Sequence, residues 1–444
     1  MEALKQFKAE INKCVKCGAC RSICPTFRVI GRESACARGK ITLIGSRLDG
    51  ELGLTDAYLK HIKECTMCGA CKDTCPNGVD TTGIINAARA EAVREQGLPL
   101  LANLVVKNIL DSSKLMPFAL KCAARFQGIF FKDSSADNGL LSRFSLLLVG
   151  GGRLIPPLAG TFFLDMPEVK ALAANTARNG KDRAAKPLEG VQPLEGVQPI
   201  KAAFYAGCGV NYLMPNVGVK SIEAVRKAGG DVVVPDSQVC CGMPAYYMGD
   251  VETARNLAMK NMETFEGYDC DYVVTACATC TYGLKSVFKE ILSGQSSETT
   301  ARVNAFCSKV MDITVLLADV LKYRPGGGKE GGGNGAKRIV TYHDPCHLNR
   351  GLGVRDEPRE LLKGNSSLVF KQMRFPCSCC GLGGGVSLAN YELSIEITKR
   401  KAESVRDSGA EVVATACPGC IVQLRDGLHK YGVDAEVKHV VELL

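Results

Sequence analysis

The chain has 444 residues, a formal net charge of +9 at pH 7, no tryptophan and 23 cysteines. Length allows about two to four domains, each able to bury its own core. A disulfide-stapled secreted protein is excluded, because such proteins are short and begin with an apolar signal segment, whereas this chain starts with an amphipathic helical pattern. We therefore expect a cytoplasmic protein whose reduced thiols serve as metal ligands.

The positive charge would by itself suggest nucleic acid or a membrane surface as a partner. Thiolates that bind clusters would offset part of this charge, so we expect no nucleic-acid partner. No run approaches the roughly 18 apolar residues of a bilayer span, and the most apolar run covers only residues 144–149. We expect no transmembrane segment, and a location in the cytoplasm or peripheral at the inner face of the membrane.

The N-terminal part carries one cysteine pattern twice. Four cysteines with two, two and three residues between them are followed by Pro25, and the copy, 51 positions later at every cysteine, is followed by Pro76. This is the spacing of ferredoxins with two 4Fe-4S clusters, in which the fourth cysteine of one run binds the other cluster. The pattern predicts two cubane clusters, one held by Cys14, Cys17, Cys20 and Cys75 and the other by Cys65, Cys68, Cys71 and Cys24.

We expect a helical ferredoxin domain over residues 1–98, with a helix over Gly39–Leu52 between the two cysteine runs. Residues 99–178 are interpreted as a helical connector without a metal motif. One helix face in the connector is apolar, and packing within the protein is favoured for it over docking to a partner or membrane. This face comprises Leu100, Leu101, Leu104, Val105 and Ile109.

Two linkers divide the rest of the chain. Residues 179–199 contain a direct duplication with frequent proline and glycine, and residues 325–336 are rich in glycine. These residues favour neither helix nor strand at such density. The linkers separate a domain over residues 200–324 from another over residues 337–444.

These last two domains are an internal repeat. In each one, short apolar strands alternate with helices, which predicts a parallel sheet. Equivalent cysteines lie 138 to 140 positions apart and follow the strand ends, where parallel sheets bind ligands. The predicted strands cover residues 202–205, 231–235 and 271–275 in the first copy, and residues 338–342 and 411–415 in the second.

Each repeat resembles the cysteine-rich (CCG) motif of heterodisulfide reductase B and D subunits. This motif consists of a lone cysteine, a later Cys-Cys-Gly triplet and a final CxxC. A doubled ferredoxin run followed by two such motifs resembles the glycolate oxidase and lactate dehydrogenase iron-sulfur subunits, as do the segments Arg38–Ile41 and Ile155–Ala159. The resemblance covers nearly the whole chain. It implies an α+β multidomain fold, in which a helical two-cluster ferredoxin domain precedes two duplicated α/β CCG domains with parallel sheets.

In heterodisulfide reductases each complete five-cysteine motif holds a noncubane 4Fe-4S cluster. The resemblance implies two such clusters here, one at Cys208, Cys240, Cys241, Cys277 and Cys280 and the other at Cys346, Cys379, Cys380, Cys417 and Cys420. Both sets are complete, whereas many glycolate oxidase subunits lack part of one, which favours the disulfide-reductase end of the superfamily. A zinc ion in one CCG domain is the alternative, because four thiolates suffice for zinc.

Five cysteines lie outside these motifs. Cys377 is two residues from a predicted ligand pair, so it is either a substitute ligand or a redox partner. The other four are expected to pack in the core as small apolar residues. They are Cys36, Cys122, Cys270 and Cys307.

Two histidines, His343 and His347, flank the predicted ligand Cys346. Either one could donate a proton at the second CCG site, but a hydrogen bond to a cysteine sulfur is the favoured role. The nearby glycines of Gly381–Gly385 lack the Lys-Ser/Thr that would follow a phosphate loop, so we expect them to permit a close backbone approach.

The resemblance implies an electron-transfer subunit that receives electrons from a separate FAD-containing glycolate- or lactate-type dehydrogenase subunit. The clusters would pass them to a downstream acceptor protein or a quinone-linked membrane protein. The sequence contains no flavin, nicotinamide or hydroxyacid site, so we expect electron transfer rather than substrate oxidation on this chain and assign no catalytic residue. Two alternatives are reduction of a disulfide at a noncubane cluster and a scaffold in which zinc occupies the repeats.

Overall fold

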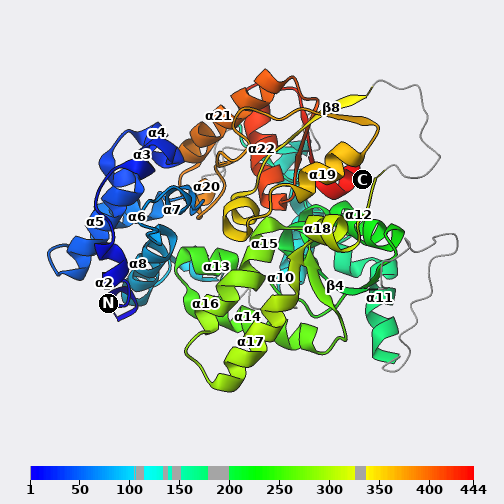
Figure 1. Ribbon diagram of the computed structural model, residues 1–444, viewed down its shortest axis with the longest axis horizontal. Coiled ribbons are helices and arrows are strands. Elements are labelled where there is room, and N and C mark those ends of the chain that lie inside the picture. Colours follow the sequence, from blue (N-terminus) through cyan, green and yellow to red (C-terminus); the bar gives the residue numbers. More distant parts are fainter. Residues whose placement is uncertain are drawn as a thin grey trace.

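The computed structural model describes residues 2–104, 106, 115–133, 139–142, 152–178, 200–325 and 337–444. The apolar run at residues 144–149 and, apart from Pro325, both predicted linkers lie outside these ranges. Figure 1 shows a helical N-terminal part in blue, a first α/β domain in green and a second α/β domain from yellow to red. Among the described helices, none has both the length and the apolar character needed to cross a membrane.

Short helices wrap around the doubled cysteine pattern of the N-terminal part. Gly18 and Gly69 adopt positive φ angles of 88° and 70° and start the helices that carry Cys20 and Cys71, a conformation that favours glycine. The core of this part contains Leu4, Ile44 and Tyr58, all at most 2% exposed. The helices are α1 (Glu2–Lys5), α2 (Lys8–Asn12), α3 (Ala19–Ile23), α4 (Pro25–Ile30), η1 (Glu33–Ala35), α5 (Ala37–Leu48), α6 (Asp56–Lys63), α7 (Ala70–Asp73) and α8 (Thr81–Gln96).

The helix predicted over Gly39–Leu52 is α5, which begins two residues earlier and ends four residues earlier. Its early end follows from local hydrogen bonding, because the backbone N–H of Gly50 donates to Arg47 and the chain turns at a φ of 83°. Glycine permits this turn at low cost.

The connector is only partly helical, whereas the sequence predicted helix throughout. A small antiparallel sheet in the order β1-β2-β3 interrupts it, because extended apolar residues near Leu140 and Leu154 pair with one another. The described elements are α9 (Leu100–Asn103), α10 (Leu115–Phe130), β1 (Phe131–Asp133), β2 (Leu140–Ser142), β3 (Leu154–Ile155), η3 (Phe163–Asp165) and α11 (Pro167–Arg178).

Two further predictions for the connector are wrong. Leu100 and Leu104 are 89% and 54% exposed, so that part of the apolar face is not packed against the protein, and Val105 and Ile109 lie outside the described residues. Cys122 was expected in the core but is exposed on α10, a helix in which no described residue is buried. Several apolar side chains of α10, among them Phe118 and Ile129, are therefore exposed.

The first α/β domain contains four parallel strands in the order β5-β4-β6-β7. Its strands are β4 (Lys201–Tyr205), β5 (Asp231–Val233), β6 (Tyr272–Thr275) and β7 (Val310–Asp312). Its helices are η4 (Gly209–Leu213), α12 (Pro215–Lys227), α13 (Met243–Met248), α14 (Val251–Glu266), α15 (Ala278–Tyr282), η5 (Gly283–Val287), α16 (Phe288–Leu292), α17 (Ser297–Lys309), α18 (Ile313–Val315) and η6 (Leu316–Val320).

The second α/β domain repeats this sheet in the order β11-β10-β8-β9. Its strands are β8 (Arg338–Tyr342), β9 (Leu368–Phe370), β10 (Val412–Thr415) and β11 (Glu436–His439). Its helices are η7 (His347–Gly351), α19 (Glu357–Gly364), α20 (Val386–Ala389), α21 (Tyr391–Ser408), α22 (Pro418–Lys430) and η8 (Val440–Leu443). The equivalent strand order, read from the opposite edge, confirms both the duplication and the parallel sheets.

Candidate iron-sulfur centres

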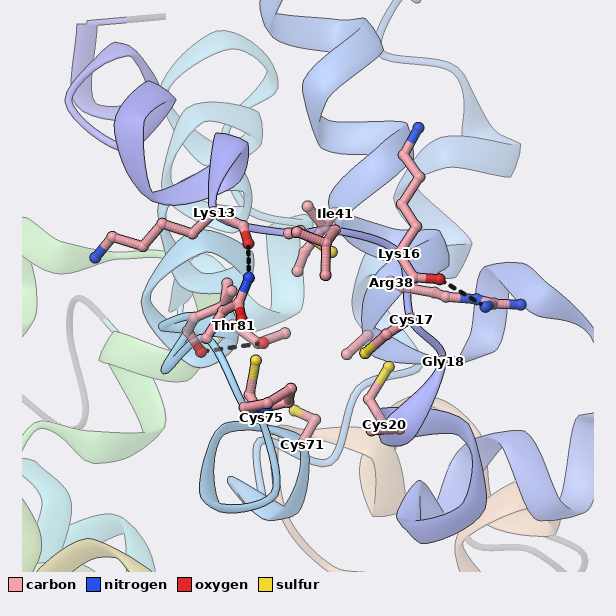
Figure 2. A pocket seen from close by; sticks show the side chains of 17 residues that line it. Lys13, Lys16, Cys17, Gly18, Cys20, Arg38, Ile41, Cys71, Cys75 and Thr81 are labelled. Atoms are coloured by element: carbon pink, nitrogen blue, oxygen red, sulfur yellow. Dashed lines mark hydrogen bonds between the residues drawn. The ribbon is translucent and has the colours of Figure 1, made fainter.

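The first cysteine group lies near the surface of the N-terminal part. Figure 2 shows Cys17, Cys20, Cys71 and Cys75 around one cavity, which Cys14 also lines. Four of these five belong to one predicted ligand set, and Cys71 belongs to the neighbouring one. The ligand assignment itself stays a prediction. Cys17 is exposed, so this group reaches the surface of the described part of the chain.

Arg38 holds the loop of the first group in place. Its guanidinium donates to the carbonyl oxygen of Lys16 at 3.0 Å and pairs with the carboxylate of Glu33. This guanidinium lowers the pKa of Glu33 to about 2. A Cβ atom at Gly18 would lie 2.7 Å from the tip of the Arg38 side chain, which can move aside, so it is the positive φ angle that favours glycine there.

A buried lysine lies beside the second cysteine group. Burial, together with the nearby thiols of Cys65 and Cys68, raises the pKa of the Cys24 thiol to about 12. The Lys40 side chain is 1% exposed, donates to the carbonyl oxygen of Ser34 at 2.9 Å and acts electrostatically on Cys24 and Cys65. The thiol of Cys71 interacts electrostatically with those of Cys24, Cys65 and Cys68. The four cysteines predicted for this cluster are thus brought together.

Arg38 and Lys40 could not be assigned roles from sequence, where they were noted only as part of a family-like segment. Between them, Gly39 packs so closely that a Cβ atom would lie 2.0 Å from the Glu33 carbonyl oxygen. Two nearby positions on α5 therefore serve the two ferredoxin-type groups, with Arg38 beside the first and Lys40 beside the second.

The glycine run after the last Cys-Cys pair meets the second ferredoxin-type group. A Cβ atom at Gly383 would lie 2.3 Å from the Thr66 carbonyl oxygen, and one at Gly384 would lie 2.2 Å from that of Cys65. The prediction of a close backbone approach is confirmed. This approach brings the thiols of Cys68 and Cys379 into hydrogen-bonding contact across two domains.

Arg89 locks the same junction. Its buried side chain donates to the carbonyl oxygens of Cys65, Tyr247 and Gly384 at 2.8, 2.7 and 3.0 Å, and also to those of Ile62 and Lys63. These carbonyls belong to the N-terminal part and to both α/β domains. One side chain therefore joins all three.

The third cysteine group lies at the carboxyl ends of the strands of the second α/β domain. The sulfurs of Cys380 and Cys420 are 3.6 Å apart, close to the roughly 3.8 Å between two thiolates on one tetrahedral zinc-sized ion. Burial raises the pKa of Cys346, and the thiols of Cys379 and Cys68 raise it further. The fifth cysteine, Cys417, has its thiol in contact with Cys420.

The fourth group repeats this arrangement in the first α/β domain. The sulfurs of Cys241 and Cys280 are also 3.6 Å apart, and the thiols of Cys208 and Cys240 are in hydrogen-bonding contact. The remaining thiol, Cys277, contacts Cys417 of the third group across the domain boundary.

The donor sets fit iron-sulfur clusters. Burial raises the pKa of many of these thiols, as at Cys379, whose pKa is raised to about 12 by its neighbour Cys380 and by burial. Hydrogen bonds from neighbouring thiols instead lower the pKa values of Cys241, Cys380 and Cys417. Bound metal would offset the cost of burial, because thiolate ligands bind as anions. Soft sulfur donors at this density suit iron-sulfur clusters or zinc and do not suit magnesium or calcium.

The cysteine groups form one continuous series. Cys71 of the second group lines the cavity of the first, Cys68 contacts Cys379 of the third, and Cys417 of the third contacts Cys277 of the fourth. The last group along this path belongs to the α/β domain that comes first in sequence. Sequence analysis could not establish this order, because it depends on how the domains dock.

His347 does not bond a cysteine sulfur, contrary to the favoured role. Its ring stacks with those of Tyr247 and Tyr282, and its nitrogens bond the Tyr247 hydroxyl at 2.7 Å and the Thr279 hydroxyl at 3.0 Å. Thr279 in turn lies 3.7 Å from the Cys417 sulfur. Burial lowers the pKa of His347 to about 4, so a neutral ring links Cys417 to a cavity of about 370 Å³ that Tyr247 and Tyr282 line.

The cysteines outside the motifs have different environments. Cys36, Cys270 and Cys307 are at most 5% exposed, which confirms the core prediction for them. Cys377 is half-buried and bonds the Asp344 carboxylate at 3.3 Å. That carboxylate is held by the Arg359 guanidinium through two contacts of 2.8 Å, so Cys377 sits beside an anchored charge.

Comparisons with known proteins agree with this arrangement. The family described as "Cysteine-rich domain" matches residues 202–285 and 340–425, and the family described as "4Fe-4S dicluster domain" matches residues 10–79. These ranges contain all 18 cysteines that the sequence predicts as ligands. The cofactor is therefore of the iron-sulfur kind.

Three curated relatives are similar over long stretches. Lactate utilization protein A of Bacillus cytotoxicus is 33% identical over 249 residues, 55% of this chain and 98% of that protein. A probable glycolate oxidase iron-sulfur subunit of Bacillus subtilis is 26% identical over 98% of this chain and 94% of its own length. A fumarate reductase (CoM/CoB) subunit of Methanothermobacter marburgensis is 28% identical over 98% of this chain and 72% of its own length.

Proposed function

The chain belongs to the family of iron-sulfur subunits that includes lactate utilization protein A and the glycolate oxidase iron-sulfur subunit, and we propose that it relays electrons for an FAD-dependent 2-hydroxyacid dehydrogenase. The observation that carries this proposal is the continuous series of four cysteine groups. Electron transfer requires neighbouring centres to lie a short distance apart. A scaffold protein would not require its metal sites to be adjacent.

We propose that each group holds one 4Fe-4S cluster. The first two would be cubane clusters, with Cys14, Cys17, Cys20 and Cys75 on one and Cys65, Cys68, Cys71 and Cys24 on the other. The CCG domains would hold noncubane clusters at Cys208, Cys240, Cys241, Cys277 and Cys280, and at Cys346, Cys379, Cys380, Cys417 and Cys420. Bound clusters would supply one-electron chemistry.

The protein's own residues fix the spacing of these groups and tune their surroundings. Arg89, Gly383 and Gly384 hold the second group against the third. Lys40 places a positive charge beside Cys24 and Cys65, which favours the more negative, reduced state of whatever cluster these thiols hold. Because Cys17 is exposed, the first group is the natural contact for an external electron donor.

The docking partners of this relay are a flavin subunit and an acceptor in the cytoplasm or at the inner face of the membrane. Exposed apolar side chains on α10 support an attachment surface, since large exposed apolar patches commonly mark interaction sites. These side chains are Phe118, Phe126, Ile129 and Phe130, between 46% and 65% exposed.

A direct experiment combines the anaerobically purified chain with its flavin subunit and the hydroxyacid. We expect the cubane clusters to be reduced when the hydroxyacid is added, as followed by electron paramagnetic resonance. Clusters that stay oxidised would contradict the relay. An iron count supplies a second check, because four clusters predict about sixteen iron atoms per chain and zinc-filled CCG domains about half that number.

A second candidate function is reduction of a disulfide at the third group. A groove of about 680 Å³ beside Cys377 and Cys379 favours it, because it could admit a small molecule. Its cationic side chains would attract an anionic disulfide. They are Arg28, Arg350, Arg374, Lys399 and Arg400, against the acidic Glu396 and Glu403. Thiol release from an anionic disulfide with a low-potential donor tests this function, and no release would reject it.

A further inference from the structure

The second CCG domain contains a buried nitrogen donor beside its cysteines. The His343 side chain lies just after β8 and is 1% exposed. One ring nitrogen, the Cys380 sulfur and the Cys420 sulfur all lie within 4.8 Å of one another. Three donor atoms at such separations can bind a single metal ion, as ligands of tetrahedral sites do.

Neither ring nitrogen of His343 has a hydrogen-bond partner among the described residues. Its backbone N–H donates to the Ala414 carbonyl oxygen at 2.9 Å, which fixes the backbone and leaves the ring unsatisfied. Buried polar groups are nearly always paired, so an imidazole with two unpaired nitrogens indicates a missing partner. The nearest candidate for that partner is a metal at Cys380 and Cys420.

The duplicated domain provides an internal comparison. Tyr205 lies three residues before Cys208, just as His343 lies three residues before Cys346. The Tyr205 hydroxyl donates to the Val239 carbonyl oxygen at 2.7 Å and is thereby satisfied. Both domains present a cysteine pair with sulfurs 3.6 Å apart. In the described part of the chain, only the second CCG domain has an unsatisfied ring nitrogen, that of His343, beside its cysteine pair.

We propose that a ring nitrogen of His343 binds the metal centre of the second CCG domain together with Cys380 and Cys420. The first CCG domain keeps sulfur donors only. The two centres, alike in their cysteines, thus differ in donor set. A neutral nitrogen in a thiolate site raises the reduction potential of an iron-sulfur centre, so the centre with His343 is reduced before the centre with Tyr205.

This inference rests on the proposed function for the identity of the metal as iron, and the ligation is tested separately. The intact, iron-loaded chain is prepared with ordinary histidine and with ¹⁵N-labelled histidine. Pulsed electron paramagnetic resonance is then recorded on the reduced protein. We expect a nitrogen coupling of the size of a directly bound imidazole, which changes with the isotope label.

Variants assign the coupling to one residue. His343→Gln is expected to remove it and to lower the midpoint potential of that centre alone, whereas His347→Gln, whose ring bonds Tyr247 and Thr279, is expected to keep it. The proposal is overturned if the labelled wild type shows no nitrogen coupling, or only the weak coupling of a hydrogen-bonded ring. It is also overturned if the coupling is unchanged in His343→Gln. The labelled wild-type arm decides even if the variant does not fold.

Metal analysis separates failure of this inference from failure of the proposed function. If metal analysis finds zinc in the second CCG domain, the proposed electron relay through that domain is wrong. X-ray absorption at the zinc edge then tests whether His343 binds the metal. A nitrogen donor beside sulfur donors that is lost in His343→Gln supports the proposal. A zinc site with sulfur donors alone overturns it.

Discussion

Replacing Arg89 by methionine should loosen the contact between the N-terminal part and the two CCG domains. Methionine keeps much of the length and apolar volume of the side chain but has no donor. The change leaves five carbonyl oxygens without the guanidinium, two of them across the domain boundaries at Tyr247 and Gly384.

The size of the effect follows from those contacts. A hydrogen bond from a charged donor contributes about 1.5–3 kcal/mol, so the two bonds across the boundaries represent about 3–6 kcal/mol of docking. The guanidinium no longer has to be kept out of water in the variant, and this offsets several kcal/mol. We expect a net loss of about 2–3 kcal/mol in docking free energy, or roughly 30- to 150-fold in the docking equilibrium.

Hydrogen exchange measured by mass spectrometry checks this expectation. Peptides that contain Cys65–Met67 and Gly383–Gly385 should exchange faster in Arg89→Met. Arg94→Met is the matched control, because Arg94 is exposed on the same helix, α8. Equal protection of both peptides in Arg89→Met and wild type would refute the locking role of Arg89.

Three further changes test other parts of the structure. Gly384→Ala should accelerate hydrogen exchange at the Cys65 junction, whereas Gly385→Ala should not. Both glycines have a positive φ, but only Gly384 approaches a backbone oxygen. Equal effects of the two variants would show that backbone strain alone matters. Lys40→Met should lower the potential of the second ferredoxin-type centre by on the order of 100 mV in a potentiometric titration, and an unchanged potential would exclude its electrostatic role. Burial lowers the pKa of His439 to about 4, below its ordinary 6.5, so its contribution to stability is complete above pH 6.5 and lost as the pH falls towards 4. Urea unfolding should therefore show that His439→Gln loses less stability on acidification than the wild type. An identical loss of stability in both proteins would contradict this.

Sequence reasoning succeeded where a local pattern determines structure. The apolar runs that end in cysteines became β4, β6, β8 and β10, because alternation of strand and helix admits few topologies. It missed β7, β9 and β11, which are strands of three or four residues and too short to give a clear periodicity in the sequence.

It also failed where the outcome depends on docking. Cys122 looked like a core residue, but α10 has no described partner surface that buries it. His347 is next to a predicted ligand in sequence, yet the rings of Tyr247 and Tyr282 draw it toward another domain. A glycine run predicted a close approach without indicating that its partner would be Cys65. Such partners are set by tertiary contacts that no local pattern encodes.

The proposed relay places four iron-sulfur centres in one series, with the centre of the second CCG domain between the ferredoxin pair and the centre of the first. Anomalous X-ray scattering at the iron edge, from crystals grown without oxygen, tests it most directly. We expect iron at all four cysteine groups, with the iron near Cys380 between that near Cys68 and that near Cys241. Iron confined to the ferredoxin pair, or a zinc-edge signal in either CCG domain, would contradict it.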